Sequence, residues 1–333
     1  MTRIFTRAAL GAALALGVAG AAGANDSTAE LATGGLVLTK TDAIEMKSED
    51  LFISEKQVRV DYRFLNISAQ DVTVTVAFPM PDITTDSLDN MIAIPTASPT
   101  NLFGFATLVD GKPAQATLEQ RAFKDGIDRT ALLQSMGVPL APHLDATNKA
   151  IEALPQAKKD QLEKLGLAID YDSSDKDPNV MEKHYQAIWT LKSAYYWRQT
   201  FPAGREISVH HSYTPSIGSS SQTQWGSKDF AADADYAAQK AKYCVDDAFL
   251  AAAARRPGLY EERIDYILTS GANWKAPIGH FHLVVDKGAP ANLVSFCGEG
   301  VKKISPTQFE VDRIDFTPTK EIAIVILGKP SGA

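Results

Sequence analysis

Four histidines come nearest to a metal-binding pattern in this sequence. His280 and His282 are two residues apart in an expected strand and so face one side of it, and His210 and His211 lie in another expected strand. If the two strands were neighbours, three imidazoles would converge as zinc requires, but a carboxylate and outer hydrogen-bond partners are needed too. An ordinary exposed or packed strand face explains the spacing better. We expect no metal and no cofactor.

Sequence motifs of common catalytic sites are absent. The chain has no H-E-x-x-H, no Gly-rich phosphate loop and no C-x-x-C, and Gly218-Ser219-Ser220-Ser221 lacks the second glycine of a nucleophile elbow. Carboxylates are plentiful, yet nothing marks two of them as a glycosidase pair. Trp225 lies in a polar segment, and we expect it to be exposed as a ligand-facing aromatic residue. The sequence therefore assigns no catalytic residue.

Cys244 and Cys297 are the only cysteines. In an oxidising compartment two such residues form a disulfide, which would close a long loop. Two buried free thiols are the alternative. We expect a Cys244–Cys297 bridge.

The first 24 residues have the pattern of a signal peptide. Arg3 and Arg7 precede an apolar stretch from Ala8 to Val18 that is too short for a membrane anchor. Ala22-Gly23-Ala24 follows the small-x-small rule, which predicts cleavage between Ala24 and Asn25. No later apolar run reaches the length of a transmembrane helix. We expect a bacterial periplasmic or secreted protein with no transmembrane segment after signal removal.

The mature chain is patterned mainly as strands. Alternation at Val58, Val60, Tyr62 and Phe64 is typical of a half-buried strand, and similar runs recur up to residue 327. Helical spacing is confined to an insertion at about 121–187 and to a segment after Val245. The prediction is a mostly β, α+β fold of two antiparallel sandwich-like lobes, with a helical insertion in the first and a helix leading into the second. The expected parts are a signal peptide (1–24), an N-terminal β-sandwich lobe (25–215), a connection with a helix (216–262) and a C-terminal β lobe (263–333).

Charge excludes one class of partner. The 33 Lys and Arg against 40 Asp and Glu give a net charge of -7, whereas a nucleic-acid binder usually carries a basic patch. Loss of Arg3 and Arg7 with the signal peptide makes the mature chain more acidic still.

Several short motifs resemble an uncharacterised bacterial exported family, domain of unknown function 4424. They are Asn25-Asp26-Ser27, Gly34-Gly35-Leu36, Ser48-Glu49-Asp50-Leu51, Phe78-Pro79-Met80-Pro81, Phe201-Pro202-Ala203-Gly204 with His211 and Tyr213-Thr214-Pro215, Gly271-Ala272-Asn273-Trp274 and Phe296-Cys297-Gly298. The resemblance covers nearly all of residues 25–330. It implies no activity and no catalytic residue.

A weaker, local resemblance concerns shape. Phe78-Pro79-Met80-Pro81, Val109-Asp110-Gly111-Lys112, Glu119-Gln120-Arg121-Ala122 and the strand at Pro202-Ala203-Gly204 are similar to the vault/inter-alpha-trypsin (VIT) β-sandwich. That resemblance implies a β-sandwich used in extracellular association, but a fold alone does not transfer a function.

The sequence thus favours a non-enzymatic role, in binding or in the structure of the envelope. The expected partner is a protein, peptide or glycan of the envelope, and not a nucleic acid. The alternative is a periplasmic hydrolase acting on envelope material, metal-dependent if the histidines converge.

Overall fold

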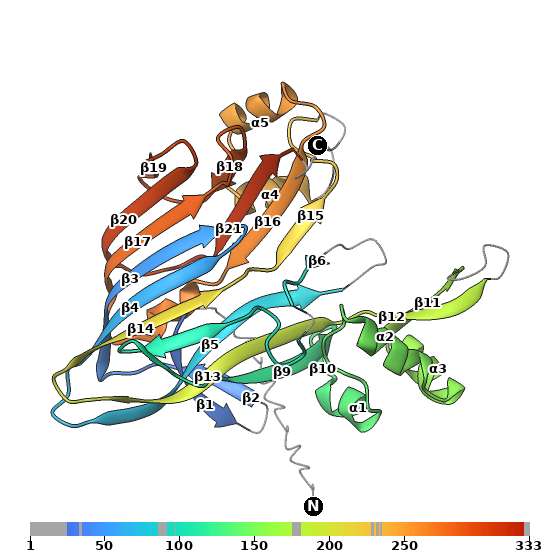
Figure 1. Ribbon diagram of the computed structural model, residues 1–333, viewed down its shortest axis with the longest axis horizontal. Coiled ribbons are helices and arrows are strands. Elements are labelled where there is room, and N and C mark those ends of the chain that lie inside the picture. Colours follow the sequence, from blue (N-terminus) through green and yellow to red (C-terminus); the bar gives the residue numbers. More distant parts are fainter. Residues whose placement is uncertain are drawn as a thin grey trace, which may run out of the picture.

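The computed structural model of the chain describes residues 25–32, 35–85, 92–96, 98–174, 181–227, 230, 233 and 235–329. Its strands form three main sheets and one hairpin (Figure 1). The predicted mostly β, α+β fold is confirmed. None of the helices within these residues is both long and apolar enough to cross a membrane. The expected signal peptide lies outside the described residues.

Sheet A has six strands among the described residues. In spatial order they are β10 (Ile127–Asp128), β9 (Thr117–Lys124), β13 (Thr190–Phe201), β5 (Val72–Thr84), β1 (Ser27–Ala32) and β2 (Gly35–Thr39). The long strands β5 and β13 pair along most of their length, with a register shift between Leu191 and Ser193.

Sheet B has eight described strands. Their order is β19 (Lys302–Lys303), β20 (Gln308–Phe316), β17 (Ile278–Asp286), β3 (Ile44–Ser54), β4 (Val58–Asn66), β14 (Glu206–Tyr213), β7 (Ala106–Val109) and β8 (Lys112–Pro113). The pairing of β17 with β3 is parallel, whereas the other described pairs in all sheets are antiparallel. Strands from both sides of the predicted lobe boundary at residue 215 therefore share one sheet, and the division into two lobes stays a prediction.

Sheet C continues the same layer with five described strands. They are β18 (Leu293–Phe296), β21 (Ile322–Gly328), β16 (Tyr260–Tyr266), β15 (Ile217–Ser220) and β6 (Ile92–Ala93). All six residues from Ile322 to Leu327 are buried, because the main core covers one face of β21 and a helical layer covers the other.

Helices occupy two places in the chain. The first three are α1 (Thr130–Ser135), α2 (Asp145–Glu152) and α3 (Gln156–Lys164), which pack beside the hairpin of β11 (Ala168–Ser173) and β12 (Glu182–Ala187). This is the expected helical insertion, and Figure 1 shows it projecting from the sheets. The others are α4 (Tyr236–Lys242) and α5 (Asp247–Ala254), followed by the 3-10 helix η1 (Thr269–Asn273). The side chain of Asp246 caps α5 by accepting from Phe249 N.

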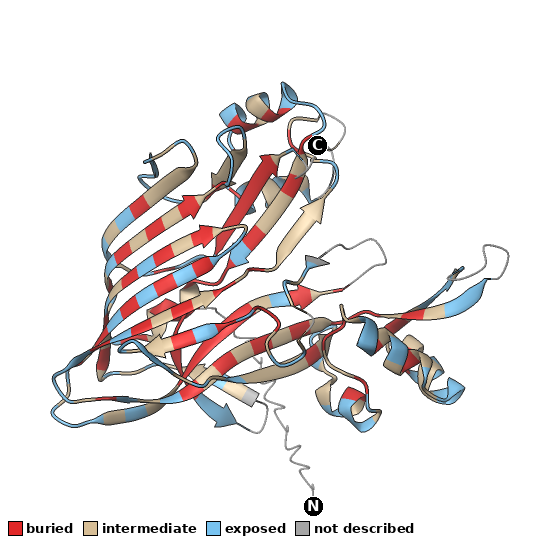
Figure 2. Cartoon of the chain, in the orientation of Figure 1, coloured by how far each residue is buried: buried red, intermediate tan, exposed pale blue. Residues whose placement is uncertain are grey.

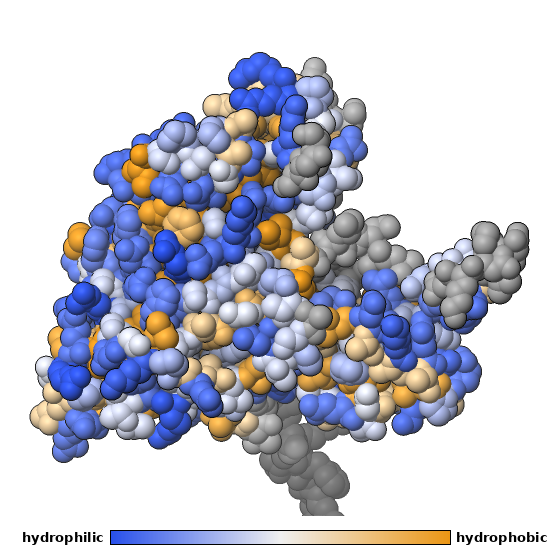
Figure 3. Space-filling view, viewed as in Figure 1, coloured by the Kyte–Doolittle hydropathy of each residue, from blue (hydrophilic) through white to orange (hydrophobic). Residues whose placement is uncertain are grey.

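The main core lies between sheet A and the layer made by sheets B and C. Alternate residues of each strand point inward, as the burial stripes in Figure 2 show. The predicted inward row of Val58, Val60, Tyr62 and Phe64 is completely or almost completely buried. On the face seen in Figure 3, hydrophilic residues predominate and apolar ones form scattered patches.

Trp225 is buried, so the expectation that it is exposed to a ligand is wrong. Only 2% of the residue is accessible, and its ring packs 5.3 Å from Tyr236 between the helices and sheet C. Sequence composition suggested an exposed loop because Ser, Gly and Gln surround this tryptophan. Its burial comes from α4 and α5, which fold back over the outer face of β21.

Gly226 allows the chain to pass this tightly packed region. Its φ of +83° lies in the left-handed region, and an added Cβ would lie 2.5 Å from Ala254 N. We predict that Gly226→Ala lowers the free energy of unfolding by about 2–4 kcal/mol, combining backbone strain and overpacking. Gly258→Ala is the matched control, because its φ is +76° but nothing lies within 4 Å of the added Cβ. Its free energy of unfolding should fall only through backbone strain, by about 1–2 kcal/mol. Urea unfolding of both variants measures the difference, and equal losses would contradict this account.

Candidate binding cleft

Each of the four candidate histidines lies beside a carboxylate. His210 and His211 are adjacent on β14 and therefore point to opposite faces of sheet B. His210 is on the outer face, with Nδ1 2.8 Å from Asp61 Oδ1, whereas His211 is fully buried in the core. On β17, His280 Nε2 lies 3.2 Å from both carboxylate oxygens of Asp312.

The histidine pairs do not converge. Strands β3 and β4 separate β17 from β14, which places the two strands roughly 14 Å apart. His282 Nδ1 instead lies 3.1 Å from Asp50 Oδ1 on the intervening strand β3. Within the described ranges, no group of three or more His, Cys, Asp or Glu residues is arranged to hold a metal ion. The geometry that would have favoured a zinc hydrolase is therefore not formed by these four residues.

A cleft of about 660 Å³ lies where sheet A meets sheet C, and we call it the lysine cleft. Its walls come from β5, β13, β16, α4 and the segments before β21 and after β18. They are Pro81, Asp82, Lys192, Ala241, Lys242, Asp265, Tyr266, Ile267, Cys297, Lys320, Glu321 and Ala323.

Ion pairs hold two of the three cleft lysines. Lys192 Nζ lies 2.7 Å from Asp82 Oδ2, and Lys242 Nζ lies 3.1 Å from Asp265 Oδ2. All four side chains are between 37% and 46% accessible, so solvent weakens both pairs. Burial lowers the pKa of Lys242, but the charges and hydrogen bonds of Asp265 and Tyr243 together more than offset this, and the pKa is raised overall. Lys242 therefore stays cationic at neutral pH.

Lys320 is the one cleft lysine without an ion pair among the described residues. It shares the cleft wall with Glu321. Glu321 is already engaged, because its carboxylate accepts from Leu268 N at 2.6 Å and from Thr269 N at 3.1 Å. A ligand carboxylate beside Lys320 would thus meet a cation that has no competing partner.

A second groove adjoins the cleft at the Asp82–Lys192 pair, and we call it the hairpin groove. Its volume is about 570 Å³, and it runs beneath the β1–β2 hairpin over the face of sheet A. Leu36, Leu38 and Phe123 supply apolar surface there. The Leu36 amide donates to both carboxylate oxygens of Glu119 at 3.1 Å, which fastens the hairpin over β9. The two depressions thus place apolar surface next to paired charges.

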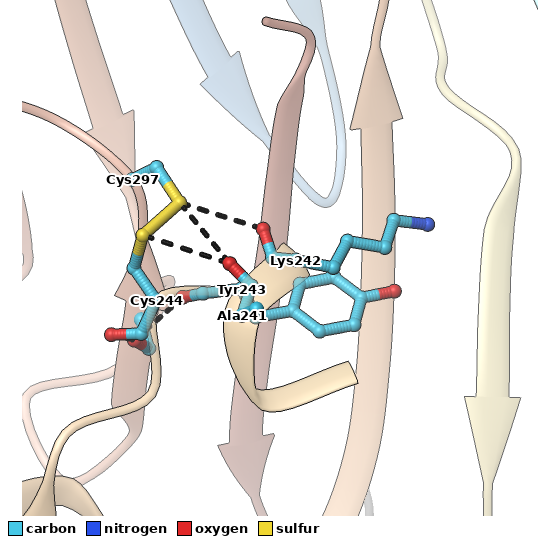
Figure 4. The surroundings of a disulfide bond; sticks show 6 residues. Ala241, Lys242, Tyr243, Cys244 and Cys297 are labelled. Carbon is cyan, nitrogen blue, oxygen red and sulfur yellow. Dashed lines mark hydrogen bonds between the residues drawn. A yellow bond between two sulfur atoms is a disulfide. The ribbon is translucent and has the colours of Figure 1, made fainter. Parts of the chain in front are cut away.

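Cys244 and Cys297 form the expected disulfide at the edge of the lysine cleft (Figure 4). Cys297 Sγ lies 3.5 Å from Lys242 O, a close contact rather than a hydrogen bond because a disulfide sulfur carries no proton. The hydroxyl of Ser295 donates to Tyr243 O at 2.9 Å on the same side. The disulfide therefore fixes the end of α4, and with it Lys242, against β18.

Two further carboxyl groups face each other away from the cleft. Glu55, in the turn between β3 and β4, is near Glu262 of β16. Burial first, and then Glu262, raise the pKa of Glu55 to about 8. Such a carboxyl pair could not be recognised in the sequence because its members are 207 positions apart in the chain. Neither residue lines the lysine cleft or the hairpin groove.

The cleft lysines and carboxylates could not be identified from the sequence. Lys192 appears as one polar position in an alternating strand, and Lys320 lies in an unremarkable polar turn. Only Cys297 carried a signal, because two cysteines in a chain expected to be exported suggest a bridge. The cleft forms where β5 of sheet A lies beside β16 of sheet C, and no local pattern specifies which strands of two sheets come together.

Comparison with known proteins identifies a family. The model of the family described as "Domain of unknown function (DUF4424)" matches residues 24–325. No curated protein matches the chain. Among solved structures, it is similar to a putative nutrient binding protein from Legionella pneumophila, with 17% identity and a TM-score of 0.46 over 92% of this chain and 70% of that one. It also matches an M1 zinc metallopeptidase from Deinococcus radiodurans with 9% identity and a TM-score of 0.21, covering 87% of this chain and 43% of that one.

Removing the disulfide should destabilise the protein without abolishing its β core. The bridged cysteines are 53 positions apart, and the chain-entropy relation gives a loss of about 4 kcal/mol for Cys244→Ser/Cys297→Ser. Guanidinium unfolding measures this loss, and reduced wild-type protein serves as the control with the same loop opened. Thiol labelling of the unfolded, unreduced wild type should detect no free cysteine. Two labelled cysteines would contradict the bridge.

Proposed function

This chain belongs to the DUF4424 family, and we propose that it is an exported, non-enzymatic binding protein that holds a short peptide in the lysine cleft. The observation that supports the proposal is the cleft itself, in which Lys320 forms no ion pair with any described residue and lies beside two solvent-weakened ion pairs. Such an arrangement suits a ligand that carries both a carboxylate and an ammonium group.

The charges of the cleft suggest how a peptide would lie. Its terminal carboxylate would bind Lys320, and its ammonium group would compete with Lys242 for Asp265 or with Lys192 for Asp82. The Asp82–Lys192 pair borders the hairpin groove as well, where Phe123 and the leucines of β2 offer an apolar surface to a side chain. This division between charged and apolar walls favours a peptide over a glycan, which would call for more hydroxyl and amide groups.

Export is part of the proposal and is supported from two sides. The signal-peptide pattern ends at Ala24, before the first described residue. The Cys244–Cys297 bridge is compatible with an oxidising compartment such as the periplasm or the extracellular medium. A periplasmic or secreted protein that binds envelope-derived peptides would meet its ligand there.

Calorimetric titration with the tripeptide Ala-Ala-Ala tests the proposal. We expect wild-type protein to bind it and Lys320→Met to bind about tenfold more weakly or worse, because a charge-assisted hydrogen bond is lost. Lys302→Met is the matched control, since this exposed lysine lies in sheet B outside the cleft and should leave the affinity unchanged. Acetylating the peptide's amine and amidating its carboxylate separately should each weaken binding.

Two outcomes would overturn the proposal. Equal affinities of wild type and Lys320→Met would show that the lysine cleft is not the binding site. The same conclusion would follow if neither acetylation of the amine nor amidation of the carboxylate weakened binding. Chromatography of the peptide after overnight incubation provides the second test. Recovery of intact tripeptide is expected, whereas progressive cleavage would favour the hydrolase alternative.

A further inference from the structure

The first described residues are polar but completely or almost completely buried. Asn25 and Asp26 have no accessible surface, although Asn and Asp side chains are usually exposed. They lie in the core among side chains of β3, β4, β14, β16 and η1. We call this group the N-terminal polar cluster: Asn25, Asp26, Glu49, Tyr62, His211, Tyr266, Ser270 and Trp274.

Asn25 is held through its main chain and its side chain. Asn25 N donates to Ser270 Oγ at 2.7 Å, and the same hydroxyl donates to Asn25 O at 2.6 Å. The side-chain amide donates to Glu49 Oε2 at 2.8 Å and accepts from the hydroxyl of Tyr62. Gly271 is required beside it, because a Cβ there would lie 2.5 Å from Asn25 Nδ2. The cluster is therefore shaped around this one residue.

Asp26 is anchored in the same way, and a histidine lies beside its carboxyl group. Its Oδ1 lies 3.0 Å from His211 Nε2, and its carbonyl oxygen accepts from Trp274 Nε1 at 2.7 Å. His211 Nδ1 lies 3.1 Å from Thr107 Oγ1 on the far side of the ring. His211 thus lies beside one of the two buried carboxyl groups and opposes the effect of burial on its pKa.

Glu49 lacks such a partner. It is 1% accessible, its Oε1 forms no hydrogen bond, and no described Lys, Arg or His forms an ion pair with it. Burial raises its pKa to about 8, while the hydrogen bond from Asn25 acts in the opposite direction. A buried carboxylate normally has a positive partner, because an isolated ion in the core is costly.

We propose that the missing cation is the α-ammonium group of Asn25, which exists only after the bond between Ala24 and Asn25 is cut. In that step water is added across the peptide bond, Ala24 keeps the carboxylate and the Asn25 nitrogen becomes an amine that takes up a proton. The nitrogen lies 2.7 Å from Ser270 Oγ, and the side chain of the same residue donates to Glu49 Oε2. The fold thus contains a built site for its own processed N-terminus, and processing completes the core.

This site is linked to the lysine cleft through two elements. Tyr266 lines the cleft, while its hydroxyl lies 3.3 Å from that of Tyr62 inside the cluster. The helix η1 holds Asn25 through Ser270 and is itself held by Glu321 of the cleft wall, which accepts from Thr269 N. Binding of the freed N-terminus in the cluster therefore stabilises the cleft wall from the core side. The proposal does not depend on what the cleft binds.

Four proteins test the proposal as a double-mutant cycle. Cleavable fusions yield one chain that begins at Asn25 and one that begins at Ala24, each with Glu49 or with Glu49→Gln. With Glu49 present, we expect the chain beginning at Asn25 to have an unfolding equilibrium constant about 10- to 100-fold smaller than that of the chain beginning at Ala24, because a buried charge gains its partner. With Glu49→Gln the two chains should be nearly equal. Asp50→Asn is the matched control, because Asp50 follows Glu49 in the chain but lies on the outer face of sheet B. This substitution should leave the stability difference between the two chain starts unchanged.

Stability as a function of pH gives a second reading of the same four proteins. In the chain beginning at Ala24 the nitrogen of Asn25 is an uncharged amide, so Glu49 has a folded-state pKa of about 8 against an ordinary value of 4.5. A pKa raised on folding contributes stability at low pH that is lost as the pH rises from 4.5 through 8. Glu49→Gln should remove this loss. The chain beginning at Asn25 should lose much less stability over the same pH range.

Other titratable groups of the cluster do not produce the same signature. Burial raises the pKa of Tyr62 and of Tyr266 well above the ordinary value, so both stay protonated. Burial also raises the pKa of Asp26, with His211 acting against it. Glu55 titrates in the same range as Glu49 but is present in all four proteins, so it cancels from the comparison.

The proposal fails if the two chain starts are equally stable with Glu49 present. It also fails if the chain beginning at Ala24 is less stable than the chain beginning at Asn25 by the same amount with Glu49→Gln as with Glu49. The difference would then be steric rather than electrostatic.

Discussion

A carboxyl group among aromatic rings must either keep its proton or find a cation, and Glu49 places this constraint at the centre of the molecule. Around it the two layers of the fold meet: Glu49 and Tyr62 come from sheet B, Tyr266 from sheet C, and the segment before β1 enters from sheet A. Asn25 bonds to the carboxyl group directly. One buried polar contact thus lies where three sheets meet, and its loss would leave an unpaired group in the core.

The parallel pairing of β17 with β3 joins the two ends of the described chain in sheet B. It joins a strand near the end of the chain to one near its beginning, so η1, which precedes β17, is carried to the buried segment before β1. The same helix is held from the cleft side by Glu321. One short element therefore connects the N-terminal polar cluster with the lysine cleft, and the disulfide fixes the opposite wall through Lys242.

Local pattern was sufficient for much of the fold and for little of the site. Alternating residues such as Val58 and Val60 revealed strands because one side of a strand faces the core, and two cysteines in a chain expected to be exported suggested their bridge. Trp225 was misjudged because its neighbours are polar, while the helices that bury it come later in the chain. Asn25 could not be recognised as a core residue, since its burial depends on Glu49 and Ser270, contacts across 24 and 245 positions that no periodicity records.

The account depends most on the buried, positively charged N-terminus, and its reactivity tests this directly. An amine-acylating reagent is applied near pH 7 to the exported protein, folded or unfolded in urea, and the N-terminal peptide is followed by mass spectrometry. We predict a peptide beginning at Asn25 whose α-amine reacts about 100-fold or more slowly in the folded protein, because the group is enclosed and hydrogen-bonded. A peptide that begins elsewhere, or an α-amine that reacts equally fast in both states, would contradict the account.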